Sequence, residues 1–285
     1  MSIKNTSYII LPLLFVMTGF TACNQKSAAD FTQSSEEIDF RIGEKIEEKN
    51  PDIEKFDAVM AKMSSRAQKE IVINDKEQFI KDLNIVLNDE KKYTSQDLSL
   101  YYLIDKKHNV SSTYVPKDLV SLKQNDLYNI NRNDLSLRPD VEEALQTLSK
   151  AAQQDGIKLL VSSTYRSYKY QETVFNKWVS IDGLEEAERE SARPGTSQHQ
   201  LGVAIDFGSI TDDFADTRMG KWLNGNAYKY GWSLSFPKGY EDITGYRWEC
   251  WHFRYIGVNA CMLQKKYFND IQQYMIEFID LWKNS

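Results

Sequence analysis

Two histidines and one aspartate are the residues of this chain whose types and spacing suit metal chemistry. The chain has only three histidines, and two of them, His199 and His252, lie in segments rich in glycine and aromatic residues. Asp206 follows His199 after Gly202 and an apolar run at 203–205. Two imidazoles and a carboxylate form a mixed nitrogen and oxygen set that suits a catalytic Zn²⁺, with a fourth position left for water. We therefore expect one zinc ion at these three residues.

The segment Ser197–Asp206 predicts how the first two ligands meet. Gly202 allows a tight bend, and the apolar run after it predicts a core strand. On that strand Ala204 and Asp206 share a face, so the carboxylate can return to the imidazole of His199. A carboxylate entering a core is costly unless a cation or a donor meets it. Taken alone, the segment fits better an ordinary turn capped by Asp206 beside a surface histidine; the second histidine motif favours the metal.

Glu249 stands three residues before His252 and is the acidic neighbour expected beside the metal. A regular strand would point these two side chains to opposite faces. We therefore predict that the backbone turns near Cys250 and runs as a strand only from Trp251. Cys250 as a fourth ligand is the less favoured alternative, because a fully occupied tetrahedral site would lose its water.

Several ordered blocks of the sequence resemble the VanY-type D,D-carboxypeptidases of the LAS metallopeptidases, a group that includes VanX-like dipeptidases and L,D-carboxypeptidases. The blocks are S-x-H-x-x-G-x-A-x-D at 197–206, E-x-W-H-F-R-Y at 249–255, Y-R-S-x-x-x-Q at 165–171, N-A-x-x-Y-G at 226–231 and S-F-P at 235–237. Ordered blocks are more specific than any single one. The resemblance, over about Tyr101 to Asp280, implies an α+β fold in which a small central antiparallel sheet flanked by helices carries the zinc site (LAS/Hedgehog-like peptidase fold).

The resemblance also implies an activity, the removal of the C-terminal D-alanine from peptidoglycan stem peptides with one Zn²⁺. Glu249 is then expected to take a proton from water and return it to the leaving amine. Arg166 is expected to stabilise the oxyanion or to orient the substrate. The other expected substrate contacts are Ser197, Gln171, Ser167, Tyr165 and Trp251.

Alternatives remain open at this stage. An L,D-carboxypeptidase or a D,D-dipeptidase would use the same scaffold. A non-catalytic cell-wall-binding lipoprotein is less favoured, because a binding module has no need for Glu249 as a general base. Ser197 is expected on the same side of a strand as His199, and its alternative role is a local turn bond.

The N-terminus predicts an export signal. Lys4 precedes an apolar run at 9–17 that is too short for a comfortable membrane span and is broken by Pro12. A small-residue site then ends at Cys23, which predicts a lipoprotein signal over residues 1–23 with lipidation of that cysteine. Plain secretion with a spare cysteine is the alternative. We expect the enzyme to be exported to the cell envelope and anchored to the membrane by lipid.

Residues 24–100 differ in composition from the rest of the chain. Glu, Lys, Asp, Ser and Gln dominate, and the first part predicts a polar tether. Apolar residues then recur at helical spacing over Ile53–Met60. We expect a helical region that acts as a solvated spacer before a catalytic domain over residues 101–285, whose first strand is Tyr101–Asp105. Docking of the helical region on the catalytic domain, or binding of a partner, is the less favoured alternative.

Charge and cysteine content limit the partners. The net charge of −6 gives no basic footprint for nucleic acid, so we expect no nucleic-acid partner. Once Cys23 is assigned to the anchor, Cys250 and Cys261 remain and can pair in an oxidising compartment, although two cysteines do not make a disulfide framework. His108 lies in a charged loop and is left out of the site.

Overall fold

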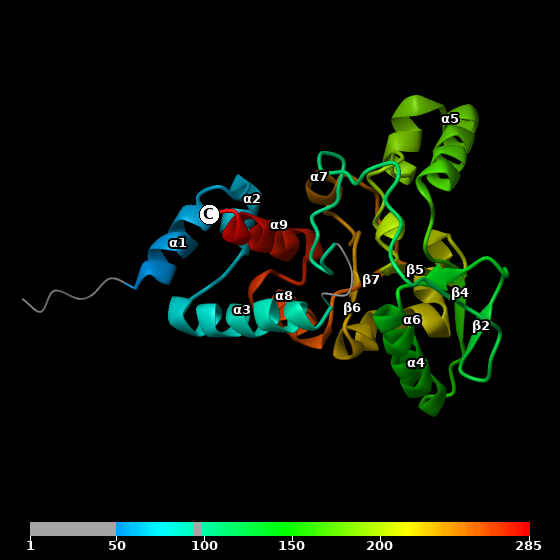
Figure 1. Cartoon of the computed structure of the whole chain (residues 1–285), viewed down its shortest axis with the longest axis horizontal. Helices are drawn as coiled ribbons and strands as arrows, with labels where there is room; N and C mark the ends of the chain where they lie inside the picture. The colour runs from blue at the N-terminus through cyan, green and yellow to red at the C-terminus, as the bar shows by residue number, and fades with distance from the viewer. Residues whose placement is uncertain (1–49, 94–97) are drawn as a thin grey trace, which may run out of the picture. The chain divides into compact units, whose positions relative to one another are not determined.

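A five-stranded sheet lies at the centre of the structure, a computed structural model that describes residues 50–93 and 98–285 (Figure 1). Its strands, in spatial order, are β2 (Tyr128–Ile130), β4 (Leu159–Ser163), β5 (Ala204–Phe207), β7 (His252–Tyr255) and β6 (Trp232–Leu234). The four strands from β4 to β6 are antiparallel, and β2 pairs with β4 in parallel. The small central antiparallel sheet is therefore confirmed, with one parallel strand at its edge. A separate antiparallel pair joins β1 (Val120–Ser121) to β3 (Ser136–Leu137).

The two central strands β5 and β7 are buried along their whole length. Their register places Asp206 directly opposite His252. Directly opposed residues of an antiparallel pair project from the same face with Cβ atoms about 4.5–5.5 Å apart. The pairing of these two strands therefore brings together a carboxylate and an imidazole that are remote in the sequence.

Helices surround the sheet (Figure 1). From the middle of the chain onward they are α4 (Pro139–Gln154), α5 (Tyr168–Glu190), η2 (Gln198–Leu201), η3 (Asp212–Asp216), α6 (Arg218–Asn226), η4 (Ala227–Tyr230), α7 (Glu241–Thr244), α8 (Val258–Tyr267) and α9 (Gln272–Lys283). Helix α4 begins at a proline, whose fixed φ suits the first helical position, and Gly156 follows its end with a φ of 70°. Helix α5 is kinked at Gly183, which has a φ of 82°.

The N-terminal helices α1 (Pro51–Met60), α2 (Ser65–Glu70) and α3 (Lys76–Glu90) are followed by the short turn η1 (Lys91–Tyr93). Helix α1 packs against α9 and α3 packs against α8 (Figure 1). Phe79 of α3 is fully buried and meets Tyr267 and Phe278 edge to face, with ring centroids 5.0 and 5.2 Å apart. The expected solvated spacer is therefore wrong for residues 50–93, because their apolar face shares a core with the two C-terminal helices.

Truncating Phe79 tests this shared core. Phe79→Ala should lower the free energy of unfolding by about 3–5 kcal/mol, the usual cost of emptying a buried phenylalanine site. Ile85→Ala is the matched control, because Ile85 lies on the same helix with 51% of its surface exposed, and it should change stability by less than about 0.5 kcal/mol. Urea unfolding of both variants measures the difference. Equal midpoints for the two variants would mean that α3 contributes no core.

The expected first strand at Tyr101–Asp105 is also wrong. The segment has no strand partner among the described residues. Instead the carbonyl oxygen of Tyr102, and that of Leu100 just before the segment, accept hydrogen bonds from Nη2 of Arg254 at 2.9 and 2.6 Å. Arg254 is 1% exposed. A buried guanidinium needs hydrogen-bond acceptors, so carbonyl oxygens here bond to the Arg254 side chain and not to a neighbouring strand.

Three further expectations concern cysteines and the membrane. Cys250 and Cys261 are buried free thiols, so the optional disulfide is absent. Cys23 and the expected signal lie outside the described residues. Within the part that the structure describes, no helix is both long and apolar enough to span a bilayer.

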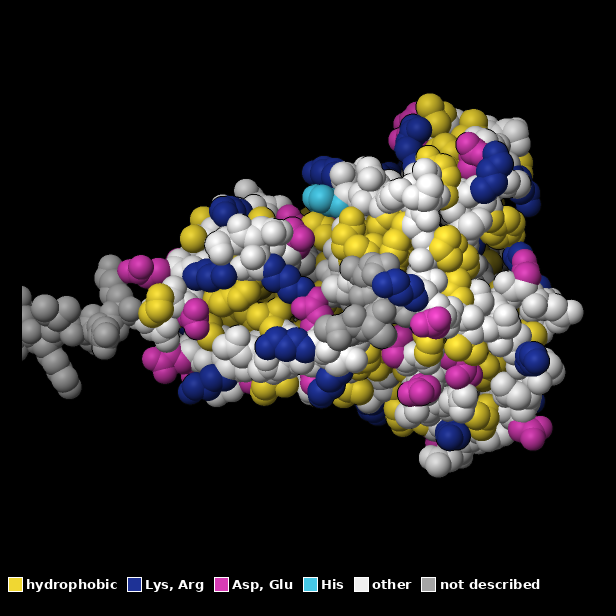
Figure 2. All heavy atoms as spheres, viewed as in Figure 1, with side chains coloured by type: hydrophobic (Ala, Val, Ile, Leu, Met, Phe, Trp, Pro, Cys, Tyr) yellow, Lys and Arg dark blue, Asp and Glu magenta, His cyan; other side chains and the backbone are white. Residues whose placement is uncertain are grey.

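On the face drawn in Figure 2, basic and acidic side chains are interspersed, so no single-sign field dominates that face.

Candidate metal site

His199 is presented by the short 3-10 helix η2, which begins after Ser197 and ends at Gly202. Gly202 has a φ of 69°, a left-handed conformation that favours glycine, and it turns the chain into β5. The expected strand at Ser197 is wrong. The Oγ of Ser197 accepts a hydrogen bond from the backbone N–H of His199 at 3.3 Å. This is the local turn bond that the sequence left as the alternative.

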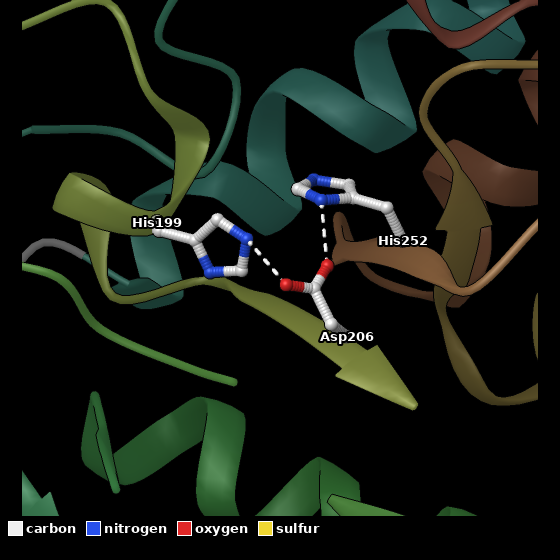
Figure 3. A group of neighbouring side chains, drawn as sticks. All are labelled: His199, Asp206 and His252. Atoms are coloured by element: carbon white, nitrogen blue, oxygen red, sulfur yellow. Dashed lines mark ion pairs between the residues drawn. The ribbon is translucent and has the colours of Figure 1, made fainter. Parts of the chain in front are cut away.

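The three expected ligands meet in one buried cluster (Figure 3). Nε2 of His199 lies 3.2 Å from Oδ2 of Asp206, and Nδ1 of His252 lies 3.0 Å from Oδ1 of the same carboxylate. The ligand atoms all lie within 4.8 Å of one another. All three residues are at most 4% exposed. The structure thus brings together residues from η2, β5 and β7.

The proton on His199 faces away from the cluster. Burial, together with the nearby Arg166 guanidinium, lowers the pKa of His199 to about 4, so the ring is neutral at pH 7. A neutral ring carries one N–H. Nδ1 lies 2.7 Å from the carbonyl oxygen of Thr164, which can only accept a hydrogen bond. Nε2 therefore presents a lone pair to the cluster, where it has no hydrogen-bond partner among the described residues.

His252 uses its opposite nitrogen. Its Nε2 lies 3.1 Å from Oε1 of Gln198, and an N–H donated to that oxygen would leave Nδ1 with a lone pair that faces Asp206. Burial favours the neutral form of Asp206, but its contacts with His199 and His252 outweigh burial and hold its pKa well below the ordinary value. Two ring nitrogens and an ionised carboxylate thus lie within 4.8 Å of one another as potential ligand atoms. This donor set fits a divalent cation, and zinc accepts this combination of ligands.

Glu249 stands beside the cluster because the chain turns before β7. A turn at Cys250 and Trp251 precedes the strand, and the N–H of His252 donates to the carbonyl oxygen of Glu249 at 3.2 Å. The predicted turn is confirmed, and the strand begins one residue later than expected, at His252. Oε2 of Glu249 lies 3.6 Å from Nδ1 of His252. Burial and the adjacent charge of Asp206 raise the pKa of Glu249 well above its ordinary value.

Arg166 leaves the end of β4 and enters the same cavity. The backbone N–H of Arg166 donates to the carbonyl oxygen of His199 at 3.3 Å. Nη2 of its guanidinium lies 3.8 Å from Oδ2 of Asp206. Only 17% of its side chain is exposed. Burial lowers its pKa from the usual arginine value, and the charges of Asp206 and Glu249 oppose that effect. The guanidinium is therefore a fixed cation beside the expected metal position.

A cavity of about 260 Å³ opens over the cluster. Arg166, Ser197, Glu249 and Trp251 line it, as the sequence led us to expect. Residues that the sequence reasoning missed also line it, among them Arg132, Tyr170, Val174, Trp178 and Arg247. Tyr170, Val174 and Trp178 recur at four-residue spacing and so occupy one face of α5. That spacing was visible in the sequence, but nothing in it showed which face meets the cavity.

Three expected substrate contacts, Gln171, Ser167 and Tyr165, lie outside the residues that line the cavity. Gln171 is 1% exposed and donates to the carbonyl oxygen of Ala192 at 2.7 Å, so it holds the loop after α5. Ser167 caps α5 by accepting a hydrogen bond from the Tyr170 N–H at 3.1 Å. Contact of these three side chains with a substrate stays a prediction.

Cys250 is not part of the metal cluster. Its Sγ lies 3.7 and 3.6 Å from the carbonyl oxygens of Thr211 and Asp212. Burial raises the pKa of its thiol, which disfavours the thiolate that zinc would need. The site therefore keeps three protein ligands and an open position, the pattern of catalytic zinc centres.

Comparison with known proteins agrees with this geometry. Residues 134–258 match the family model described as VanY, D-alanyl-D-alanine carboxypeptidase. The Bacillus subtilis protein YodJ is 37% identical over 164 residues, which cover 55% of this chain and 60% of that protein. The chain thus spans less than two thirds of this relative's length.

Two further relatives are matched over most of their own length. An Enterococcus gallinarum protein, the bifunctional D-Ala-D-Ala dipeptidase and D-Ala-D-Ala carboxypeptidase VanXYC, is 30% identical over 164 residues, 55% of this chain and 83% of that protein. The structure of the LD-carboxypeptidase LdcB superposes with a TM-score of 0.55 at 34% identity, over 62% of this chain and 84% of that one. With the His-Asp-His cluster and its flanking glutamate in place, the chain belongs to the VanY family of D-alanyl-D-alanine carboxypeptidases.

Proposed function

We propose that this protein is a zinc-dependent carboxypeptidase that removes the C-terminal D-alanine from peptidoglycan stem peptides. One observation carries the proposal: three buried ligand atoms lie close together, and an acid and a guanidinium lie beside them. The family to which the chain belongs supports the reaction class, and the names of its relatives support the substrate class.

His199, Asp206 and His252 would hold the zinc, through Nε2, the carboxylate and Nδ1. Zinc bound there supplies a Lewis acid that lowers the pKa of a water molecule to about 7. Burial keeps bulk water away from the cluster, which strengthens electrostatic interactions within it. The protein's own residues then move the proton and stabilise the charge that develops on the substrate.

Glu249 is placed to move that proton. Its carboxylate lies 3.6 Å from a ligand nitrogen, so it reaches a water molecule bound beside the cluster. A cation at the cluster favours the ionised form of Glu249 and opposes the effect of burial on its pKa. The carboxylate accepts the proton of the attacking water and delivers it to the nitrogen of the leaving D-alanine.

Arg166 is placed to stabilise the oxyanion of the tetrahedral intermediate. Arg166→Ala should lower kcat about 10²- to 10³-fold, the usual effect of removing one oxyanion donor, while zinc content stays at the wild-type level. Arg166→Lys should recover only part of the loss, because lysine lacks the planar fork of donors. Steady-state kinetics with zinc analysis tests this. An unchanged kcat with a raised KM would assign Arg166 to ground-state binding instead.

An L,D-carboxypeptidase is the second candidate, favoured by the similarity to LdcB. Purified protein incubated with muropeptides that end in D-Ala-D-Ala or in a single D-Ala discriminates the two. We expect loss of one alanine from the D-Ala-D-Ala substrate, and no loss after chelation. Release of intact D-Ala-D-Ala would indicate a dipeptidase, and cleavage of only the single-D-Ala substrate would indicate an L,D-carboxypeptidase. No chelator-sensitive cleavage of any of them would contradict the proposal.

The proposed site of action is the cell envelope, with the chain exported and lipid-anchored at Cys23. The support is the apolar run that ends in a small-residue site at this cysteine. The full-length chain should incorporate a labelled fatty acid and fractionate with membranes, whereas Cys23→Ser should incorporate none. Equal labelling of the two would contradict the anchor.

A further inference from the structure

A buried chain of hydrogen bonds connects the ligand His252 to the C-terminal helix α9. Nε2 of His252 lies 3.1 Å from Oε1 of Gln198. Nε2 of Gln198 donates to Oε1 of Gln272 at 3.5 Å, and Nε2 of Gln272 donates to the carbonyl oxygen of Ser233 at 3.3 Å. Gln198 is 7% exposed and Gln272 is 1% exposed. Water therefore offers little competition for these bonds.

The donor-to-acceptor direction of these hydrogen bonds is set at the end away from His252, where Gln272 meets the Ser233 carbonyl. An amide side chain can be turned end for end, and only its partners decide which way it faces. The Ser233 carbonyl is a main-chain acceptor, so Gln272 must turn its NH₂ group toward it and its oxygen toward Gln198. Gln198 must then turn its NH₂ group toward Gln272 and its oxygen toward His252. The hydroxyl of Ser235 lies 2.8 Å from that Gln198 oxygen and 3.2 Å from Oε1 of Gln272, so its single proton points toward the two amide oxygens.

This direction decides which nitrogen of His252 carries the proton. An acceptor opposite Nε2 requires an N–H there, which leaves Nδ1 deprotonated beside Asp206. If the Gln198 amide were reversed, a donor would face Nε2 and the proton would move to Nδ1. A protonated Nδ1 cannot bind a metal. The orientation of one neutral amide therefore favours or disfavours the tautomer in which His252 binds a metal through Nδ1.

We propose that Gln272 is a positioning residue, which acts through Gln198 to hold His252 in the tautomer that binds metal. Its helix lies outside residues 134–258, the part matched by the family model. That helix is in turn held by α1. The terminal helices of this chain thus support a metal ligand at the centre of the sheet. This inference rests on the proposed metal site and adds residues to it that the motifs do not contain.

Zinc affinity of the apo-protein tests the proposal without any activity measurement. Gln272→Met keeps the volume and removes the hydrogen bonds, and it should weaken zinc binding about 10- to 100-fold, the usual cost of losing an outer partner of a ligand. Tyr274→Phe is the matched control. Tyr274 lies two residues after Gln272 on the same helix and is fully buried. Its hydroxyl donates to Glu70 of α2 at 3.1 Å and takes no part in the relay, the hydrogen bonds that join Gln272 through Gln198 to His252. It should leave zinc affinity within about twofold, well inside the tenfold that corresponds to 1.4 kcal/mol.

Two further readouts separate positioning from general damage to the fold. The double variant Gln198→Met, Gln272→Met should bind zinc no more weakly than Gln198→Met alone, because both changes break one relay. Nitrogen-15 NMR of histidine-labelled apo-protein should show His252 protonated at Nε2 in the wild type and a loss of that preference in Gln272→Met.

Additive losses in the double variant, or equal zinc affinity for Gln272→Met and Tyr274→Phe, would overturn the proposal. So would a wild-type His252 protonated at Nδ1. If the wild-type protein bound no zinc at all, the proposed function would fail, while the NMR experiment would still decide whether the relay sets the tautomer.

Discussion

Glu249→Gln should lower kcat by about 10²- to 10⁴-fold, the range expected when a positioned general base is removed, while the protein keeps its zinc. The amide has nearly the same shape as the carboxylate but cannot accept a proton. Glu249 lies beside the cluster and is not one of its three ligands. The expected result is thus a metal-loaded, nearly inactive protein. Turnover of a peptide ending in D-Ala-D-Ala, with zinc analysis of the same sample, measures both quantities.

Glu190→Gln provides the matched control for this experiment. Glu190 is another glutamate of the same cavity, and its carboxylate pairs with Arg247 at 3.4 Å, away from the cluster. The control should keep activity within about tenfold of the wild type, a change of no more than 1.4 kcal/mol in the barrier. Full activity in Glu249→Gln would rule out its role as the base. A loss of zinc from Glu249→Gln would make it a ligand instead.

His252→Ala should abolish zinc binding and activity together. Removal of this imidazole leaves two ligands from η2 and β5, and it leaves the buried carboxylate of Asp206 without one of its two imidazole neighbours. Zinc content by elemental analysis and peptide turnover measure the two losses.

His108→Ala is the control for the histidine variant. Half of the His108 side chain is exposed, and the ring contacts the nearby carboxylate of Asp105. This variant should retain the zinc content and the turnover of the wild type. A His252→Ala protein that kept its zinc but lost activity would move the metal site elsewhere and leave His252 with a different catalytic role.

The candidate site was predictable because its signals are local. Gly202 marks the bend after His199, and the apolar run beyond it marks a buried strand on which a carboxylate is unexpected. The three-residue spacing of Glu249 and His252 implied the turn at Cys250 that the structure shows. Each of these features is set by a few consecutive residues. The sequence therefore predicted the ligand cluster better than it predicted the cavity around it.

The parts that the sequence did not predict depend on distant partners. The apolar face of α3 shows that the helix packs, but Tyr267 and Phe278 lie almost two hundred residues further along. The run Tyr101–Asp105 has the composition of a strand, yet its carbonyl groups serve Arg254. Gln272 is uncharged and belongs to no motif, so nothing in its neighbourhood linked it to His252.

The central claim is that two imidazoles and one carboxylate hold a single zinc ion with an open position. Anomalous diffraction at the zinc edge from crystals of the purified protein tests it most directly. We predict one strong peak, about 2.0–2.1 Å from Nε2 of His199 and from Nδ1 of His252, with Asp206 as the third protein ligand. No peak at this cluster, or a zinc ion bound by other residues, would contradict it.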